Sequence, residues 1–532
     1  MDVTATSWEA RAAAKRANTL AKIPLAWQLD PSQLEKPGDI AIVSRDSVEL
    51  VNDVKNGKLT ATEVTAAFCK TSAIAHQINN CLHEIFFDQA LKRAAELDAY
   101  YTETGKTAGP LHGLPISLKD QFHVKGVATT MGYVGWIGSN LGIKDPRDTH
   151  RVESQITTEL LSLGAVLFCK TSLPQTLLFG ETKNNIIGET RNPHNQNLSC
   201  GGSSGGEDAL QALRGSTLGV GTDIGGSVRI PAGFNGIFSL KPTPERLSYR
   251  DVANTNLGKI HTARQLDSSD PAVVPIPFRE EQLSGVQGRA DERGKAKESL
   301  LPLKLGVLWT DKTVGPHPPI LRGLHQVVNA FRAAGHKVMD WEPPSHATAK
   351  QIHVSFLFAD GAHDIHSHLN LSGEPLIPDL EEFFQLRPPM GLLETQNLTL
   401  RGLEYEAAYS DYWNSSAGED GQIVDAVIMP VAPHAAVIPG RYFHTAYTEV
   451  INLLDYSSVV IPVTKADKTV DVFDNSYEPL NELDRKNWEA YEPEIYDGAP
   501  VGVQLVARKF QEEKILGIVE IVVAALNSYG DK

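Results

Sequence analysis

The chain has 532 residues, 41% of them hydrophobic and 21% charged, which is the usual balance of a globular protein with a large buried core. Its formal net charge of −16 disfavours nucleic acid as a partner, because an acidic surface repels phosphate groups. The four cysteines are widely scattered and show no CxxC spacing, so neither a disulfide framework nor a zinc knuckle is indicated.

Targeting and membrane signals are not evident in the sequence. The N-terminal segment has no apolar signal-peptide core, and Asp2 and Glu9 count against a transit peptide. Near the other end, Ile515–Leu526 is short and interrupted by Glu520, which predicts a buried helix rather than a membrane span. We therefore expect a cytoplasmic protein with no membrane partner.

Amphipathic helices are predicted for residues 1–104. Apolar residues recur at steps of three and four in Ser47–Lys55, Thr60–Gln77 and Phe87–Tyr101, and Gly105 follows as a stop signal. This part of the chain is expected to be mainly helical.

Farther along, short apolar strands alternate with helices, which is typical of a layered α/β domain with a largely parallel sheet. The expected strands are Leu114–Lys119, Ala165–Lys170, Lys304–Trp309, Lys337–Trp341, Ala426–Met429, Val459–Val463 and Val501–Ala507. Helices are expected at Arg151–Leu163 and Pro318–Ala334. Two polar stretches punctuated by proline, Asn254–Glu298 and Thr464–Asp497, are predicted to be surface loops.

Two glycine-rich clusters, Gly201–Gly206 and Thr222–Ser227, each contain serine. Glycine lets backbone N–H groups converge on one point, and a serine among them has the nucleophile and the oxyanion donors that acyl transfer requires. The plainer alternative is that the glycines make tight turns and that Ser203 or Ser204 caps a helix beginning near Glu207. A nucleophile elbow is disfavoured because polar, turn-rich residues, not a strand, precede the first cluster.

Lys119 is a candidate base for such a serine. A serine hydroxyl needs a base within hydrogen-bond reach, and lysine serves only when neutral, a form that burial favours by lowering its pKa. Lys119 ends the apolar run Leu114–Leu118, which indicates a partly buried position. Seen alone, it would be interpreted as a surface lysine at a strand end; the glycine clusters favour the catalytic interpretation.

Together, Gly113–Asp120 and Gly201–Ile230 resemble the amidase signature family, and Asp360–Ile377 resembles its acetamidase-like fungal branch. The resemblance implies an α/β amidase signature fold, with a mixed, largely parallel central sheet covered by helices on both faces. It also implies a single domain over residues 1–532. The parts of this domain would be a mainly helical N-terminal part (1–104), a catalytic core (105–243), a shortened irregular segment (244–303) and a C-terminal α/β part (304–532).

Carried over residue by residue, the resemblance implies a catalytic triad. Ser227 would be the nucleophile, Ser203 a second serine that is held through a cis peptide bond and relays the proton, and Lys119 the final base. Ser203 and the backbone of Leu177 would contact the substrate. The backbone N–H groups that would form the oxyanion hole are those of Ile224, Gly225, Gly226 and Ser227.

Three further motif positions would support the site: Ser204, Asp223 and Arg229. A structural ion pair is the favoured interpretation of Asp223 and Arg229. No metal and no organic cofactor is implied.

Three histidines, His363, His366 and His368, lie within six residues and raise the question of a metal site. Helical spacing puts the first two on one face and leaves the third off it. We favour a helix near the substrate entrance over a metal site.

The chain departs from the family after Thr243. Members ordinarily continue with a Gly-Pro-Met segment and a helix, but Pro244–Asp270 passes quickly into Pro271–Phe278, and no helical periodicity in Val252–Asp267 replaces them. That helix normally packs on the core, so its loss is expected to expose apolar surface or to loosen the site.

The sequence therefore predicts an amidase that hydrolyses a small carboxamide to a carboxylate and ammonia or an amine through an acyl-enzyme. An esterase or transamidase, a catalytically impaired binding protein and a tRNA-dependent amidotransferase subunit are alternatives. The acidic charge and the acetamidase-like middle region count against the last. Substrate size and oligomeric state are left open, a homodimer included.

Overall fold

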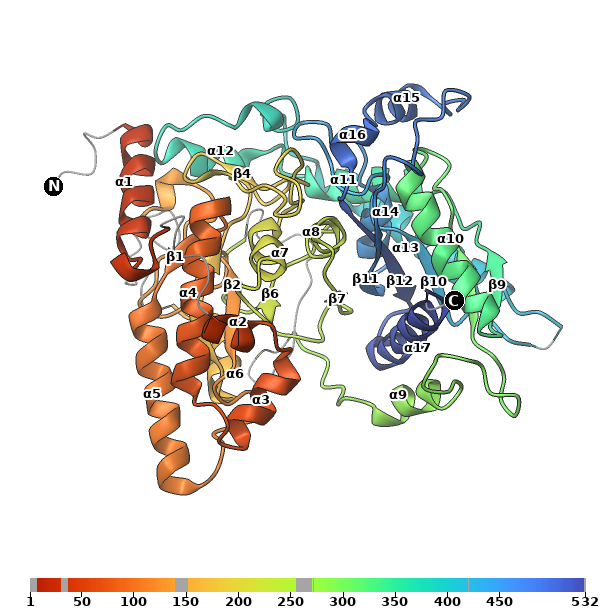
Figure 1. Cartoon of the computed structure of the whole chain (residues 1–532). Coiled ribbons are helices and arrows are strands. Elements are labelled where there is room, and N and C mark those ends of the chain that lie inside the picture. The colour runs from red at the N-terminus through yellow and green to blue at the C-terminus, as the bar shows by residue number, and fades with distance from the viewer. Residues whose placement is uncertain are drawn as a thin grey trace.

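Strands of the computed structural model belong to two sheets and one short ribbon (Figure 1). The structure describes residues 7–29, 37–138, 152–254, 270, 272–419 and 421–530. The four-stranded sheet has the order β1-β3-β2-β6, with β1 Leu82–Ile85, β2 Pro115–Lys119, β3 Val166–Thr171 and β6 Gly219–Val220. The six-stranded sheet has the order β7-β11-β12-β10-β8-β9, with β7 Ser239–Lys241, β8 Lys304–Val307, β9 Lys337–Asp340, β10 Ala426–Pro430, β11 Ser457–Lys465 and β12 Pro500–Ala507. The ribbon pairs β4 Lys183–Asn184 with β5 Gly188–Glu189.

Both sheets are mixed. β2 pairs in parallel with β3 and β6, whereas β1 runs antiparallel to β3. In the larger sheet β10, β8 and β9 are parallel, and the ladders that join β10, β12, β11 and β7 are antiparallel. The α/β class and the mixed sheet are confirmed. The structure differs from the expected single central sheet in having two separate hydrogen-bonded sheets. Most of the antiparallel ladders lie in the six-stranded sheet.

Helices cover both faces of the six-stranded sheet, as expected. Alternate side chains of a strand point to opposite faces. Ala426 and Ile428 of β10 therefore join one apolar cluster with α10 and α17, while Val427 and Met429 join another with α11, α13 and α14. The bounds of these helices are α10 Pro318–Ala333, α11 His346–Leu357, α13 Leu392–Ser415, α14 Ala446–Leu453 and α17 Glu512–Gly530.

The N-terminal helices were largely predictable. They are α1 Trp8–Ala21, α2 Pro37–Val43, α3 Ser47–Lys55, α4 Ala61–Asn79 and α5 Phe87–Thr104, and α4 and α5 lie beside the four-stranded sheet (Figure 1). A capping box between Asp46 and Glu49 starts α3, and a second between Thr60 and Glu63 starts α4. Helix α5 ends at Gly105, whose φ of +66° suits glycine.

Several expected boundaries and loops were wrong. Helix α6 is Gln155–Ser162, so it starts later than Arg151, a position outside the described residues. The predicted loop Asn254–Glu298 contains α9 Glu280–Gln287, which packs through buried Val286 against α17. The predicted loop Thr464–Asp497 contains the short helices α15 Glu482–Glu489 and α16 Pro493–Tyr496. Tertiary packing stabilises these short elements where periodicity gave no signal.

Two helices connect the sheets. Helix α7, Gly205–Ala212, contacts β2 and β6, while α8, Arg229–Asn235, contacts β11 and β12 (Figure 1). Each glycine-rich cluster precedes one of these helices. The two clusters therefore meet between the sheets.

The chain after Thr243 is anchored to the C-terminal helix by charged groups. Arg246 forms ion pairs with Glu512 and Glu513 of α17, and the Thr243 N–H donates to Glu512 Oε1 at 2.7 Å. Phe238, Leu240 and Leu247 nearby remain exposed. The sequence predicts that the family's helix after Thr243 is absent. Residues 255–269, which fall in this segment, lie outside the described part of the chain.

The predicted C-terminal buried helix is present as part of α17, with Ile515, Ile518 and Val522 in the core. Within the described residues, none of the helices has the length and hydropathy that crossing a membrane requires.

Candidate active site

Lys119, the last residue of β2, is fully buried, as are the four strand residues before it. Its Nζ lies 2.7 Å from Ser203 Oγ and 2.9 Å from Thr222 Oγ1. Burial lowers the pKa of Lys119 to about 7, although the negative charges of Asp223 and Asp208 oppose this shift. A substantial fraction of Lys119 is therefore neutral at neutral pH.

The first glycine cluster turns sharply to present Ser203. The peptide bond Gly202–Ser203 is cis, and Gly201 has a φ of +80°. A Cβ on Gly202 would lie 2.8 Å from the Glu181 carbonyl oxygen and 2.9 Å from that of Phe179, so only glycine fits there. Ser203 is thereby held against Lys119.

The second cluster is organised by the Asp223 carboxylate. Asp223 accepts hydrogen bonds from the backbone N–H groups of Gly226, Val228 and Arg229, at 2.8, 3.2 and 3.3 Å. The expected ion pair is present, with Arg229 Nε 3.0 Å from Asp223 Oδ2. Burial alone would raise the pKa of Asp223, but the Arg229 guanidinium holds it well below its usual range.

One of the four expected oxyanion donors is already bonded in this structure: the Gly226 N–H donates to Asp223 Oδ1 at 2.8 Å. Ile224, Gly225 and Ser227 of the same loop line the pocket. Gly226 has a structural part: its φ is +124°, and a Cβ there would lie 2.2 Å from Thr448 Oγ1.

Ser204 joins the two glycine-rich clusters through hydrogen bonds. Its N–H donates to the Ser227 carbonyl at 3.0 Å, and its Oγ lies 3.3 Å from both the N–H nitrogen and the carbonyl oxygen of Thr222. Ser204 is the N-cap residue of helix α7, which begins at Gly205, but its side chain makes no capping hydrogen bond, so the alternative that a serine side chain caps this helix is not realised.

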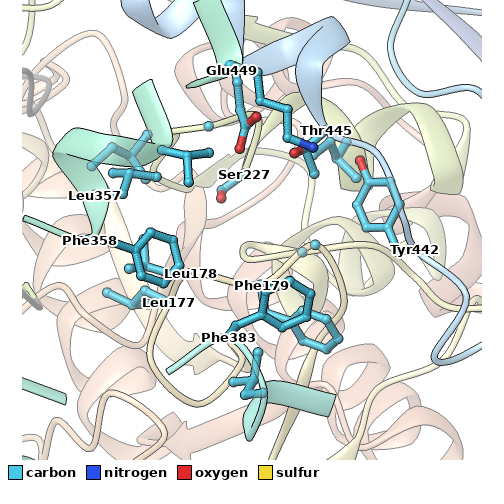
Figure 2. Close-up of a pocket in the computed structure, with 18 of the residues that line it drawn as sticks. Leu177, Leu178, Phe179, Ser227, Leu357, Phe358, Phe383, Tyr442, Thr445 and Glu449 are labelled. Carbon is cyan, nitrogen blue, oxygen red and sulfur yellow. The ribbon is translucent and has the colours of Figure 1, made fainter. Parts of the chain in front are cut away.

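A cavity of about 220 Å³ opens beside Ser227, whose hydroxyl points into it (Figure 2). Leu177 lines the cavity, as expected for a residue that contacts substrate. Both Thr176 and Leu177 have positive φ, +75° and +63°, a strained backbone that is concentrated at functional sites. The other apolar lining residues are Leu178, Phe179, Ile224, Ile230, Val354, Leu357, Phe358, Leu380, Phe383, Phe384 and Phe443.

Sequence reasoning did not assign the roles of Gln121 and Thr222, which lie beside Lys119. Gln121 Nε2 donates to the Ala253 carbonyl at 3.0 Å, so its Oε1 faces the Thr222 hydroxyl, at 2.7 Å. Thr222 therefore donates to Gln121 and can only accept from Lys119. Gln121 Nε2 also reaches Tyr249 OH at 2.7 Å, which ties the segment after Thr243 to the lysine. The position of Gln121, two residues beyond Lys119, was the only signal.

The three histidines lie on α12, His363–Asn370. His363 and His366 face the carbonyl oxygens of Arg387 and Phe384, at 3.1 and 2.7 Å, whereas His368 contacts Trp136. The expected separation of faces is confirmed. Phe384 lines the cavity, which places α12 close to it.

Comparison with known proteins identifies the family. A family model described as Amidase matches residues 63–516. The chain belongs to the amidase family. It is 40% identical to an acetamidase of Aspergillus oryzae and to an acetamidase of Emericella nidulans, in each case over 97% of this chain and 98% of the relative. This amidase is a C–N hydrolase that acts on amides.

A solved structure of fatty acid amide hydrolase matches the amidase with a TM-score of 0.86 and 29% identity, over 97% of this chain and 94% of that chain. The match confirms the expected fold. The alignment with the Aspergillus oryzae acetamidase runs over 552 positions, more than the 532 residues here. That relative therefore contains residues with no counterpart in this chain.

Proposed function

We propose that this amidase hydrolyses a small carboxamide with an apolar acyl group, using Ser227 as nucleophile, Ser203 as proton relay and Lys119 as base. The observation that carries the proposal is the 2.7 Å contact between Lys119 Nζ and Ser203 Oγ. Burial supports it by lowering the pKa of the lysine to about 7. A mostly apolar cavity beside Ser227 gives the acyl group its place.

In the first half-reaction, neutral Lys119 takes a proton from Ser203 as Ser203 takes one from Ser227. The Ser227 oxygen attacks the amide carbon, and the N–H groups of Ile224, Gly225 and Ser227 receive the developing oxyanion. The C–N bond then breaks, and the nitrogen leaves as ammonia or an amine with the proton returned through Ser203. The product on the enzyme is an ester of Ser227.

In the second half-reaction, water attacks this ester and gives its proton to the same relay. The carboxylate leaves, and Ser227 regains its hydroxyl. Every proton transfer and charge contact in this scheme uses groups of the chain itself.

We also propose that residues 1–532 act as a single domain. Lys119 comes from the four-stranded sheet, whereas the Ser227 loop is bonded to α14 and β12 through Arg229, which donates to the Thr448 carbonyl and to Gln504 Oε1, both at 3.0 Å. Catalysis through this relay requires both sheets to keep their relative position.

The proposal is tested with a fluorophosphonate probe, intact mass measurement and peptide mapping. We expect one adduct, on Ser227, and none in Ser227→Ala. An adduct on Ser203 or Ser204, or no adduct on a folded protein, would contradict the scheme. The absence of an adduct would favour a catalytically impaired protein, although Lys119 and Ser203 are in contact. Panels of amides, esters and acceptor amines then separate hydrolysis of amides from esterase and transamidase activity.

A further inference from the structure

Helix α14 presents one polar face to the loop that precedes Ser227. Thr448 Oγ1 donates to the Gly225 carbonyl at 2.7 Å. One turn later, Asn452 Nδ2 donates to the Asp223 carbonyl at 2.9 Å and to its Oδ1 at 2.8 Å. These bonds fix the helix relative to the loop, so Glu449, on the same face, is held in place too.

Glu449 lies directly over Gly225. A Cβ placed on Gly225 would be 3.5 Å from Glu449 Cγ and 3.9 Å from its Oε1, with the His353 ring beside them. The Glu449 side chain lines the cavity, and Figure 2 shows its carboxylate directed toward Ser227. A carboxylate therefore stands next to the place where the reacting carbonyl must sit.

One carboxylate oxygen of Glu449, Oε2, has no hydrogen-bond partner among the described residues. Glu449 is 7% exposed, and its Oε2 is buried without a hydrogen bond to any described residue. A buried polar atom is ordinarily satisfied, and an unsatisfied one in a mostly apolar cavity indicates that a ligand supplies the missing donor.

The character of that donor follows from the charges around the cavity. Lys350 also lines it, and no ion pair joins Lys350 to Glu449 among the described residues. Because the cavity already holds one cation and one anion, a neutral N–H group suits it better than a second cation.

We infer that Glu449 accepts a hydrogen bond from the N–H of the scissile primary carboxamide and thereby selects amides with a free –NH2 group. When the substrate carbonyl oxygen lies at the oxyanion donors of Gly225, the amide nitrogen is bonded to the same carbon and is near the Glu449 carboxylate. The interaction strengthens as the leaving nitrogen gains its proton and positive charge. The inference rests on the proposed function and adds a specificity residue to it.

The test compares a substrate that has N–H donors with a reagent that has none. The substrate is hexanamide, and the reagent is the fluorophosphonate that labels Ser227. We expect kcat/KM for hexanamide to fall about 30-fold in Glu449→Leu, the loss of one charge-assisted hydrogen bond, while the labelling rate stays within about twofold of wild type. Glu449→Gln keeps one acceptor oxygen and should lose about fivefold. Glu404→Leu, an exposed glutamate on α13, is the matched control and should change neither rate.

Other outcomes overturn the inference. Equal losses in amide hydrolysis and labelling would give Glu449 a structural role only, and no loss in either would remove it from the substrate contacts. Dependence on Glu449 for 6-aminohexanamide alone would assign the carboxylate to the acyl side. A wild-type protein that is labelled at Ser227 yet leaves hexanamide intact would reject the inference while keeping the catalytic scheme. Absence of Ser227 labelling in wild type would reject the scheme itself.

Discussion

Two fully buried lysines lie at or next to the ends of neighbouring parallel strands, and of the two only Lys170 has a carboxylate within ion-pair distance among the described residues. Lys119 at the end of β2 contacts the hydroxyl groups of Ser203 and Thr222. Lys170 near the end of β3 lies 3.2 Å from the Asp120 carboxylate, with Thr129 and the Ala128 carbonyl as further partners. Burial is the main cause that lowers the pKa of both lysines, and Asp120 opposes it at Lys170.

The comparison shows one type of buried side chain in two electrostatic settings. Lys170 with its counter-ion forms a buried ion pair, and this cation holds the pKa of Asp120 well below its usual range. Lys119 has no carboxylate within ion-pair distance among the described residues, so its neutral form is accessible. The counter-ion, rather than burial, distinguishes Lys170 from Lys119, the proposed base.

The largest expected effect is on activity in Lys119→Met. Removal of the base should lower kcat/KM on the order of 10⁴-fold, because the members of a serine–base relay act as a unit. The apolar side chain fits a buried site, so the free energy of unfolding should stay the same or rise. Amide hydrolysis and denaturant unfolding of the same preparation measure both. A variant that retains a tenth of wild-type activity would remove Lys119 from the relay.

Lys170→Met should produce the opposite pattern. It leaves the buried Asp120 carboxylate without its cation and should cost about 3–5 kcal/mol of unfolding free energy. Folded molecules should keep most of their kcat. The double variant Asp120→Asn with Lys170→Met removes both charges and should recover part of the stability. A Lys170 variant as stable as wild type would show that the pair is dispensable.

The pH dependence of kcat/KM should show the titration of Lys119, in a pH range where buried Glu207 also titrates because burial raises its pKa to about 7. Below pH 7 the fraction of neutral lysine, and with it kcat/KM, should fall about tenfold per pH unit, and above pH 7 the profile should level off. The pKa is about 7 in the folded protein against 10.5 for an ordinary lysine. Between these values the unfolded chain binds more protons, so this group makes the free energy of unfolding rise with pH. A profile with no inflection near 7 would contradict the assignment.

The smallest effect is expected for Gln121→Leu. Without the acceptor at Gln121, Thr222 no longer has a fixed orientation toward Lys119, and kcat should fall about fivefold, the cost of one neutral hydrogen bond. KM should change little, since Gln121 does not line the cavity. Thr222→Val should reproduce the same loss, and the double variant should lose no more than either single one. Independent, additive losses would refute a shared role.

Much of this architecture could be predicted because its signals are local. Short apolar runs predicted the bounds of β2, β3, β8 and β12 within a residue or two. Capping residues lie at the starts of α3 and α4. The resemblance selected Lys119, Ser203 and Ser227, and the structure brings Lys119 and Ser203 together while Ser204 joins the two serine clusters. The roles of these residues remain predictions.

The remaining features depend on contacts that pattern does not encode. Helix α9 is stabilised by packing on α17, more than 220 residues away. The engagement of the Gly226 N–H by Asp223 follows from the folded path of the loop. Glu449 belongs to an apolar helix sequence, and only its position over Gly225 makes it notable. Residues at catalytic clefts are assembled from distant segments, which is why sequence patterns alone missed them.

The most direct test of the central claim is an NMR titration of lysine ε-carbons in protein carrying ¹³C-labelled lysine. Lys119→Met and Lys170→Met assign these two resonances, each by its absence, and so distinguish them from that of Lys241, a third buried lysine. The account predicts a midpoint near pH 7 for Lys119, and a clearly higher midpoint for Lys170, which has its counter-ion. A Lys119 resonance that titrates near 10.5, as an exposed lysine does, would contradict its role as the neutral base.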